Sequence, residues 1–232
     1  MDSIDPRRRA GRDLARKMAP KLALIPLGLA AVVFIPAGTF AFWQAWIFLA
    51  ALLAPMTAVL IYLMRYDPGL LERRLQMREK EPQQKLVIKL GGVCVAALMV
   101  LPGLDRRWGW SEIPAALTLA ADVVLVGAYL FVFWVLKVNS YASRTVEVRP
   151  GQQIITTGPY AIVRHPMYLG SLTLYLMIPL ALGSFWALLA YPPLPFIFAL
   201  RIRNEEEVLM KDLAGYAEYR ETVRAKVLPR IW

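Results

Sequence analysis

The sequence predicts an all-α fold: a polytopic bundle of transmembrane helices with a pocket at its cytoplasmic face and a short C-terminal helix. The chain has 232 residues, of which 58% are hydrophobic and 19% are charged. A soluble domain averages roughly half apolar and a quarter charged residues. The apolar residues also form long blocks, and the basic residues gather beside those blocks. Block length and flanking charge together indicate an integral membrane protein.

Six apolar blocks are predicted to form membrane-spanning helices, because a helix needs about 20 mostly apolar residues to cross a bilayer. Pro26 and Pro36 are expected to bend the first block or to mark its ends, and Pro102-Gly103 is expected to end the third. The last two blocks are short and meet at Gly183-Ser184, so they form a hairpin that spans the membrane or enters it only part-way. The six blocks are 22–40, 43–64, 86–101, 113–138, 168–182 and 186–200.

The positions of the charges favour membrane lipids over nucleic acid as partners, although the formal net charge is +10. If all six blocks span, nearly every Lys and Arg lies on one side, in the N-terminus, residues 65–85, residues 139–166 and the tail after Leu200. The positive-inside rule then predicts that both termini and these polar segments are cytoplasmic. The first block is of spanning length and others follow it, so we do not expect a cleaved signal peptide. Residues 65–85 are predicted to be a solvated connector lying on lipid headgroups.

The predicted spans contain few polar residues, which argues against a channel. Gln44 and Asp122 are the main exceptions, and Asp122 is expected to lie near the outer interface or to be hydrogen-bonded within the bundle. Cys94 is the only cysteine and His165 the only histidine. We therefore predict neither a disulfide within the chain nor a metal site.

Two polar segments after residue 138 carry the chemical signal, RHPMYLG at 164–170 and RIRNEEEVL at 201–209. Taken alone, each has an ordinary explanation. Arg201 and Glu205 share a helix face and suit a surface ion pair, and His165 beside a proline suits a structural hydrogen bond. Pro166 fits the first turn of a helix, whose start would point free N–H groups at a ligand.

In this order and spacing, the two segments resemble the isoprenylcysteine carboxyl methyltransferase family. Its hallmark is RHPxYxG, then a helical hairpin, then R-x-x-x-E-E-x-x-L. Leu213, Gly215, Tyr216 and Tyr219 also look like the family's tail, with a loop one residue shorter. The resemblance covers roughly residues 139–232. It divides the chain into residues 1–138, with four helices, and a methyltransferase catalytic region over 139–232.

The resemblance implies an S-adenosylmethionine site and an arginine that faces the methyl acceptor. Three glutamates run together, and with Leu209 and Leu213 as anchors the family's acidic pair falls on Glu205 and Glu206. The same anchoring puts the arginine on Arg201 rather than Arg203, as the catalytic and substrate-binding residue. The implied cofactor-binding residues are Gln152, Gln153, Ile154, Ile155, Tyr160, His165, Pro166, Met167, Tyr168 and Glu205.

The implied activity is carboxyl O-methylation of a lipophilic, isoprenylcysteine-like small molecule or lipidated substrate. An arginine can hold a carboxylate, and a carboxylate is ionised at neutral pH, so no strong base is needed. The alternatives are a phospholipid N-methyltransferase, whose ammonium acceptor would need a base, and a small-thiol S-methyltransferase. An NADPH-dependent membrane reductase is more distant, and the chain has no GxGxxG fingerprint. The sequence leaves the acceptor and the oligomeric state open.

Overall fold

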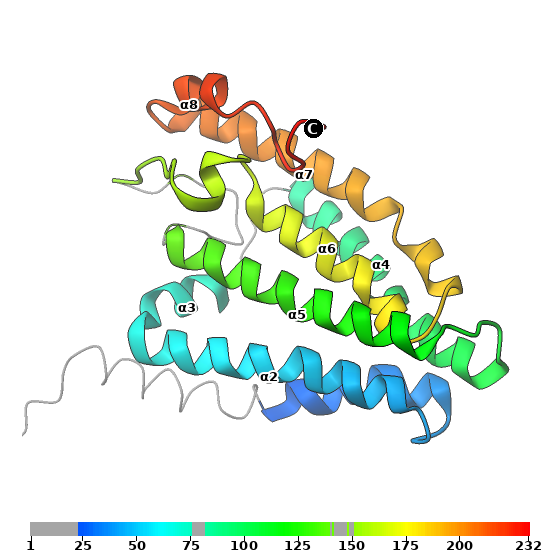
Figure 1. Ribbon diagram of the computed structural model, residues 1–232. Coiled ribbons are helices and arrows are strands. Elements are labelled where there is room, and N and C mark those ends of the chain that lie inside the picture. Colours follow the sequence, from blue (N-terminus) through cyan, green and yellow to red (C-terminus); the bar gives the residue numbers. More distant parts are fainter. Residues whose placement is uncertain (1–22, 76–81, 140, 142–147, 149–150) are drawn as a thin grey trace, which may run out of the picture.

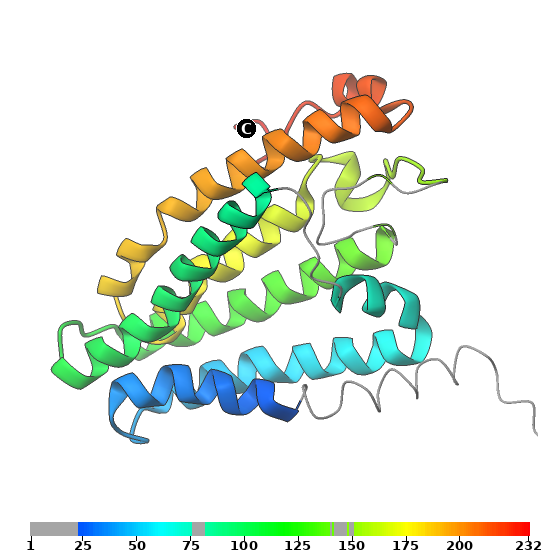
Figure 2. The same ribbon diagram turned by 180° about the vertical axis from the view of Figure 1, so that it is seen from behind.

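The structure is a computed structural model that describes residues 23–75, 82–139, 141, 148 and 151–232. Every regular element in these residues is helical. The helices lie lengthwise beside one another (Figures 1 and 2), with α3, α8 and the segment before α6 at one end and short turns at the other. The predicted all-α bundle is confirmed in these parts of the chain.

Among the described residues, three helices are long and apolar enough to cross a membrane: α2 (Trp43–Tyr66), Lys85–Trp108 within α4 (Pro82–Trp108), and α5 (Ala115–Val138). The helix Ala23–Ala37 and α6 (Pro166–Ala181) are also apolar but shorter. These helices support an integral membrane protein. The C-terminal helix is confirmed as α8 (Tyr216–Thr222).

The predicted end of the third block at Pro102 is wrong, because α4 continues through this proline to Trp108. A proline inside a helix removes one backbone hydrogen bond, and tertiary contacts of the following turn offset that loss. The carboxylate of Asp105, which is buried, accepts hydrogen bonds from Ser111 N (2.7 Å) and from the Ser184 hydroxyl (2.5 Å). The last turn of α4 is thereby tied to the turn after α6.

The sixth apolar block is not one helix, as predicted for residues 186–200. A short 3-10 helix, η2 (Trp186–Ala190), is followed by α7 (Pro193–Asp212). Pro192, Pro193 and Pro195 have no N–H to give to a preceding turn, so the long helix can begin only here. Consequently α7 runs from the apolar block straight through the RIRNEEEVL segment, and one rigid helix carries both Arg201 and Glu205.

The connector over residues 65–85 is only partly as predicted. Pro68–Leu75 form α3, whose Leu70 and Leu71 are buried against Val59 and Leu136. Asp67 Oδ1 accepts a hydrogen bond from the Leu70 amide at 3.0 Å, which stabilises the start of this helix. This half of the connector is packed rather than solvated, while residues 76–81 lie outside the described residues.

The bundle core joins the helix Ala23–Ala37 to α2, α4, α5, α6 and α7. The helices α5 and α6 approach closely at Gly170, where a Cβ would lie 2.5 Å from Val132 Cγ2. Asp122 is buried, and neither its carboxylate nor the Thr118 hydroxyl has a hydrogen-bond partner among the described residues. Of the two alternatives expected for Asp122, a position near the outer interface or a hydrogen bond within the bundle, the second is therefore not met among the described residues.

Candidate active site

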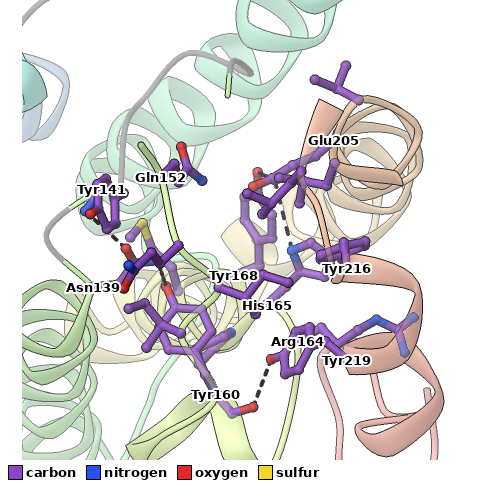
Figure 3. Close-up of a pocket in the computed structure, with 18 residues that line it drawn as sticks. Asn139, Tyr141, Gln152, Tyr160, Arg164, His165, Tyr168, Glu205, Tyr216 and Tyr219 are labelled. Carbon is purple, nitrogen blue, oxygen red and sulfur yellow. Dashed lines mark hydrogen bonds and ion pairs between the residues drawn. The ribbon is translucent and has the colours of Figure 1, made fainter. Parts of the chain in front are cut away.

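An open cavity, whose lining residues are drawn in Figure 3, lies at the end of the bundle that holds α3 and α8 in Figure 1. The space between its walls is about 910 Å³, including its solvent-facing mouth. The end of α5, the segment before α6, the start of α6, the polar half of α7 and the region of α8 all contribute to its walls. The lining residues are Asn139, Tyr141, Gln152, Gln153, Ile154, Ile155, Tyr160, Arg164, His165, Pro166, Met167, Tyr168, Glu205, Val208, Leu209, Leu213, Tyr216 and Tyr219.

Tyr160 is fixed at both of its polar atoms. It belongs to the 3-10 helix η1 (Gly158–Ala161). Its hydroxyl accepts a hydrogen bond from Asn139 Nδ2 at 3.0 Å, and its carbonyl accepts one from the Tyr219 hydroxyl at 2.7 Å. Burial raises the pKa of Tyr160 to about 12. The ring therefore presents a neutral aromatic surface to the cavity at physiological pH.

The loop that carries His165 is held by the C-terminal tail. The amides of Arg164 and His165 donate to the carbonyls of Ala225 (3.0 Å) and Lys226 (2.8 Å). The Arg164 guanidinium donates to two further tail carbonyls, those of Val223 and Arg224, at 2.7 and 2.8 Å. These hydrogen bonds fix the backbone of His165 to the C-terminal tail. The helix α6 begins at the next residue, Pro166, as predicted.

Glu206 is the hub of a buried ion-pair cluster behind the cavity wall. Its Oε1 lies 2.8 Å from Arg164 Nε and 3.2 Å from His165 Nε2, and its Oε2 lies 3.4 Å from Lys226 Nζ. Burial alone would raise the pKa of Glu206, but hydrogen bonds and charges from His165 and Arg164 lower it to about 2. An ionised carboxylate only accepts hydrogen bonds, so His165 Nε2 carries the proton in this pair.

Glu205 lines the cavity directly and is connected to Arg201 through a tyrosine. The Tyr168 hydroxyl donates to Glu205 Oε2 at 2.6 Å and accepts from Arg201 Nε at 3.0 Å. His165 Nδ1 lies 3.9 Å from the same carboxylate oxygen. The Glu205 carboxylate thereby joins α7 to α6, because Tyr168 lies on α6 and Glu205 on α7 (Figure 3).

The three consecutive glutamates face different surroundings, so the structure distinguishes them. Glu205 lines the cavity, and Glu206 is buried with Arg164. Glu207 is exposed and pairs with Arg203 at 3.2 Å, one helical turn away on the solvent face. Of these three glutamates, Glu205 alone is among the residues that line the cavity, and the assignment of the family's acidic pair to Glu205 and Glu206 stays a prediction.

All ten residues predicted to hold a cofactor line this single cavity. Arg201, the predicted substrate-binding residue, is not among the lining residues and reaches the site through Tyr168. Sequence reasoning missed Asn139, which gives no motif signal, and the bracing role of Arg164, which lies inside the RHP motif. Tyr216 and Tyr219 are family-like positions to which the sequence assigns no role.

Comparison with known proteins agrees with this site. No curated protein matches the chain. Residues 118–211 match the model of the isoprenylcysteine carboxyl methyltransferase (ICMT) family. The matched region begins within α5, upstream of the predicted boundary at residue 139, and contains both polar motifs. The predicted resemblance is thus confirmed over residues 118–211, which match the model of the isoprenylcysteine carboxyl methyltransferase family.

Proposed function

We propose that this protein binds S-adenosylmethionine in the cavity and methylates the carboxylate of a lipophilic, isoprenylcysteine-like acceptor. The observation that carries the proposal is the convergence of His165, Tyr168 and Glu205. These residues come from the two motifs, some forty positions apart, and line one cavity. All three residues lie within residues 118–211, which match the model of the isoprenylcysteine carboxyl methyltransferase family.

The residues around the cavity suit this cofactor. S-adenosylmethionine supplies an electrophilic methyl group on a sulfonium, together with an adenosine and a zwitterionic amino-acid end. The aromatic rings of Tyr160 and Tyr168 offer cation–π stabilisation to a sulfonium. The Glu205 carboxylate can accept hydrogen bonds from ribose hydroxyls or from an ammonium group. The backbone of residues 152–155 offers donors and acceptors for an adenine edge.

Arg201 is the proposed holder of the acceptor. Its Nε is engaged by Tyr168, and a guanidinium presents further N–H donors in a planar fork. A carboxylate held there by two parallel hydrogen bonds would retain a free oxygen lone pair for attack. Catalysis then consists mainly of holding the acceptor in line with the methyl donor.

A second candidate acceptor class is favoured by one observation. His165 lies between the carboxylates of Glu205 and Glu206, with its Nε2 proton bound by Glu206. Its other ring nitrogen lies on the Glu205 side of the cavity, 3.9 Å from Glu205 Oε2, and would accept a proton there in the neutral imidazole. A thiol or an amine, which must lose a proton on methylation, would use such a group. A carboxylate acceptor would not need it.

We also propose that the cavity opens on the cytoplasmic side. The end of the bundle that carries the cavity includes Arg65 and Lys137 in the last turns of α2 and α5. The sequence has further bases in residues 1–21, before the first described helix, and in residues 65–85, after α2. The positive-inside rule makes this the cytoplasmic face.

The proposal is tested first by calorimetry of the purified protein in detergent with S-adenosylhomocysteine and, separately, with NADPH. We expect binding of S-adenosylhomocysteine alone. Binding of NADPH alone would replace the methyltransferase with a reductase.

A radiolabelled-methyl screen then identifies the acceptor class among isoprenylcysteines, phosphatidylethanolamine and small thiols. Mild alkali separates the products, because it releases methanol from a methyl ester but leaves N-methyl and S-methyl groups in place. Alkali-labile label supports carboxyl methylation. Alkali-stable label on a thiol or an amine would favour the second candidate.

A further inference from the structure

Asn139, which caps the end of α5, has its side-chain amide fixed in one orientation. The Tyr141 backbone N–H donates a hydrogen bond to Asn139 Oδ1 at 3.0 Å. A backbone N–H can only donate, so the atom that it meets is the amide oxygen. The other end of the amide, Nδ2, therefore faces the Tyr160 hydroxyl, 3.0 Å away (Figure 3). Both contacts belong to the cavity wall, because all three residues line the cavity.

This orientation determines how the Tyr160 hydroxyl can act. An amide NH₂ group only donates, so the hydroxyl oxygen accepts from Asn139 and must give its own proton to another acceptor. Among the described residues, Asn139 is the hydrogen-bond partner of this hydroxyl, which leaves the proton without an acceptor there. Burial raises the pKa of Tyr160 to about 12, so the proton stays on the oxygen at neutral pH. Because Tyr160 lines the cavity, a bound ligand can supply the acceptor.

Other phenolic hydroxyls of the cavity wall differ from that of Tyr160. The Tyr168 hydroxyl donates to Glu205, and the Tyr219 hydroxyl donates to the Tyr160 carbonyl. These two protons are already bound by acceptors of the protein. The Tyr216 hydroxyl has no partner among the described residues, but its oxygen is fully buried. The Tyr160 hydroxyl combines an unbound proton with a partly exposed side chain.

The chemistry of the two proposed ligands favours a carboxylate as the acceptor of this proton. The methyl donor and the proposed methyl acceptor each carry a carboxylate, which is ionised at neutral pH. A hydrogen bond to an ionised oxygen is roughly twice as strong as one between neutral groups. Tyr160 lies on η1 and Glu205 on α7, so different walls can bind the carboxylate and the ammonium of one amino-acid group.

We propose that Asn139 is a positioning residue that keeps the Tyr160 hydroxyl as a hydrogen-bond donor, and that this hydroxyl binds a ligand carboxylate in the cavity. The inference rests on the proposed function and adds to it the direction of one hydrogen bond. Two ligands could supply the carboxylate: the methyl donor, through its amino-acid end, or the methyl acceptor. The same phenolic donor recognises both. The hydroxyl acts at the edge of the Tyr160 ring, so the ring face stays available to a sulfonium.

The donor arm of the test compares two ligands by calorimetry: S-adenosylhomocysteine and the same molecule without its carboxylate. The proteins are the wild type, Tyr160→Phe, and Tyr66→Phe as a matched control. Tyr66 ends α2, is 57% exposed and is not among the residues that line the cavity. We expect Tyr160→Phe to bind S-adenosylhomocysteine roughly 10- to 100-fold more weakly and the decarboxylated analogue with unchanged affinity. Tyr66→Phe should match the wild type with both ligands.

The role of Asn139 is tested by a double-mutant cycle of Asn139→Asp and Tyr160→Phe. Aspartate keeps an oxygen for the Tyr141 amide but replaces the Nδ2 donor with an acceptor, so the Tyr160 hydroxyl would donate to it instead. The negative charge that aspartate adds acts on a ligand whether or not the hydroxyl is present. We therefore expect Asn139→Asp to weaken binding more in the wild type than in Tyr160→Phe, by roughly 5-fold or more. Additive effects of the two substitutions would overturn the positioning role of Asn139.

The acceptor arm measures the KM for N-acetyl-S-farnesylcysteine in the same variants. An increase in this KM in Tyr160→Phe, with unchanged binding of S-adenosylhomocysteine, assigns the carboxylate to the acceptor and supports the inference; the cycle is then measured on this KM. Equal weakening of both nucleosides in the donor arm shows a merely structural role of the hydroxyl and overturns the inference. Wild-type behaviour of Tyr160→Phe in both arms also overturns it and leaves the methyltransferase proposal intact. Failure of the wild type to bind S-adenosylhomocysteine is instead the failure of the proposed function.

Discussion

Replacing Glu206 with Gln removes the negative charge at the centre of the buried cluster that braces the His165 loop. The carboxylate lies 2.8 Å from Arg164 Nε, and both side chains are buried. The variant keeps the size of the side chain but leaves the guanidinium without its counter-ion. We therefore expect a large loss of stability from a change of one atom.

The magnitude follows from the pKa of Glu206, which is lowered from 4.5 to about 2. At ~1.4 kcal/mol for each pH unit, this lowering corresponds to about 3 kcal/mol of stability at neutral pH. Breaking a buried pair by removing one partner typically costs about 3–5 kcal/mol, which agrees. For a chain of this length, about 3 kcal/mol corresponds to a fall in Tm of roughly 6–12 °C.

The sign of the pH dependence follows from a folded-state pKa that lies below the unfolded one. The contribution of Glu206 is fully present above pH 4.5 and is lost as the pH falls toward 2. The difference in Tm between the wild type and Glu206→Gln should therefore be constant from neutral pH down to about 5 and shrink below that.

The assay is thermal unfolding in detergent, followed by tryptophan fluorescence, with Glu207→Gln as the matched control. Glu207 is the adjacent residue and pairs with Arg203, but both side chains are mostly exposed, at 65% and 77%. Exposed pairs contribute about 0–1 kcal/mol, so the control should differ little from the wild type. Equal effects of the two substitutions, or a Glu206→Gln difference that grows in acid, would refute the reasoning.

Four further outcomes are expected from the same contacts. Gly170→Ala should lower the free energy of unfolding by about 1–3 kcal/mol, because the added Cβ would lie 2.5 Å from Val132 Cγ2. The control is Gly127→Ala, whose Cβ would meet nothing within 4 Å. In the same thermal scan this control should be neutral or slightly stabilising. Tyr168→Phe removes the hydroxyl between Arg201 and Glu205 and should lower kcat by roughly 10-fold without a change in Tm of more than about 2 °C; wild-type kcat would contradict the link. Arg201→Ala should lose turnover but retain S-adenosylhomocysteine binding, whereas Glu205→Ala should weaken that binding in calorimetry; full activity of both removes their assigned roles. Deleting residues 225–232 removes the carbonyls that hold the amides of Arg164 and His165 and should abolish S-adenosylhomocysteine binding; retained affinity would show that the tail is dispensable.

The sequence predicts the membrane class and the cavity residues well for a physical reason. Spanning helices leave a strong local signal, because about 20 apolar residues are needed in succession. The two polar motifs stand out against that background, since polar groups are costly at membrane depth. Gln152 and Glu205 line one cavity as the motif predicts, although nothing local to either residue says that their segments meet.

The errors occur where tertiary contacts or proline chemistry override the apolar pattern. Pro102 marks a helix end by its own chemistry, yet the buried hydrogen bonds of Asp105 sustain another turn of α4. Pro192 and Pro193 interrupt the last apolar block, although the residues on both sides of them are apolar enough to suggest one continuous span. The connector before α4 looks solvated by composition, but only its packed structure shows that Leu70 and Leu71 are inside.

The different surroundings of the three adjacent glutamates could not be predicted from the sequence alone. Glu205, Glu206 and Glu207 are chemically identical in sequence. Their helical directions differ by about 100° at each step, so one faces the cavity, one the buried Arg164 and one the solvent. Anchoring on Leu209 and Leu213 predicts the register, while the bracing role of the second glutamate follows only from its ion pairs.

The most direct test of a single cofactor site built from both motifs is an experimental structure of the protein bound to S-adenosylhomocysteine. The account predicts ligand density that contacts Tyr168 at the start of α6 and Glu205 on α7 at once. Density elsewhere in the bundle, or against only one of these two helices, would contradict it.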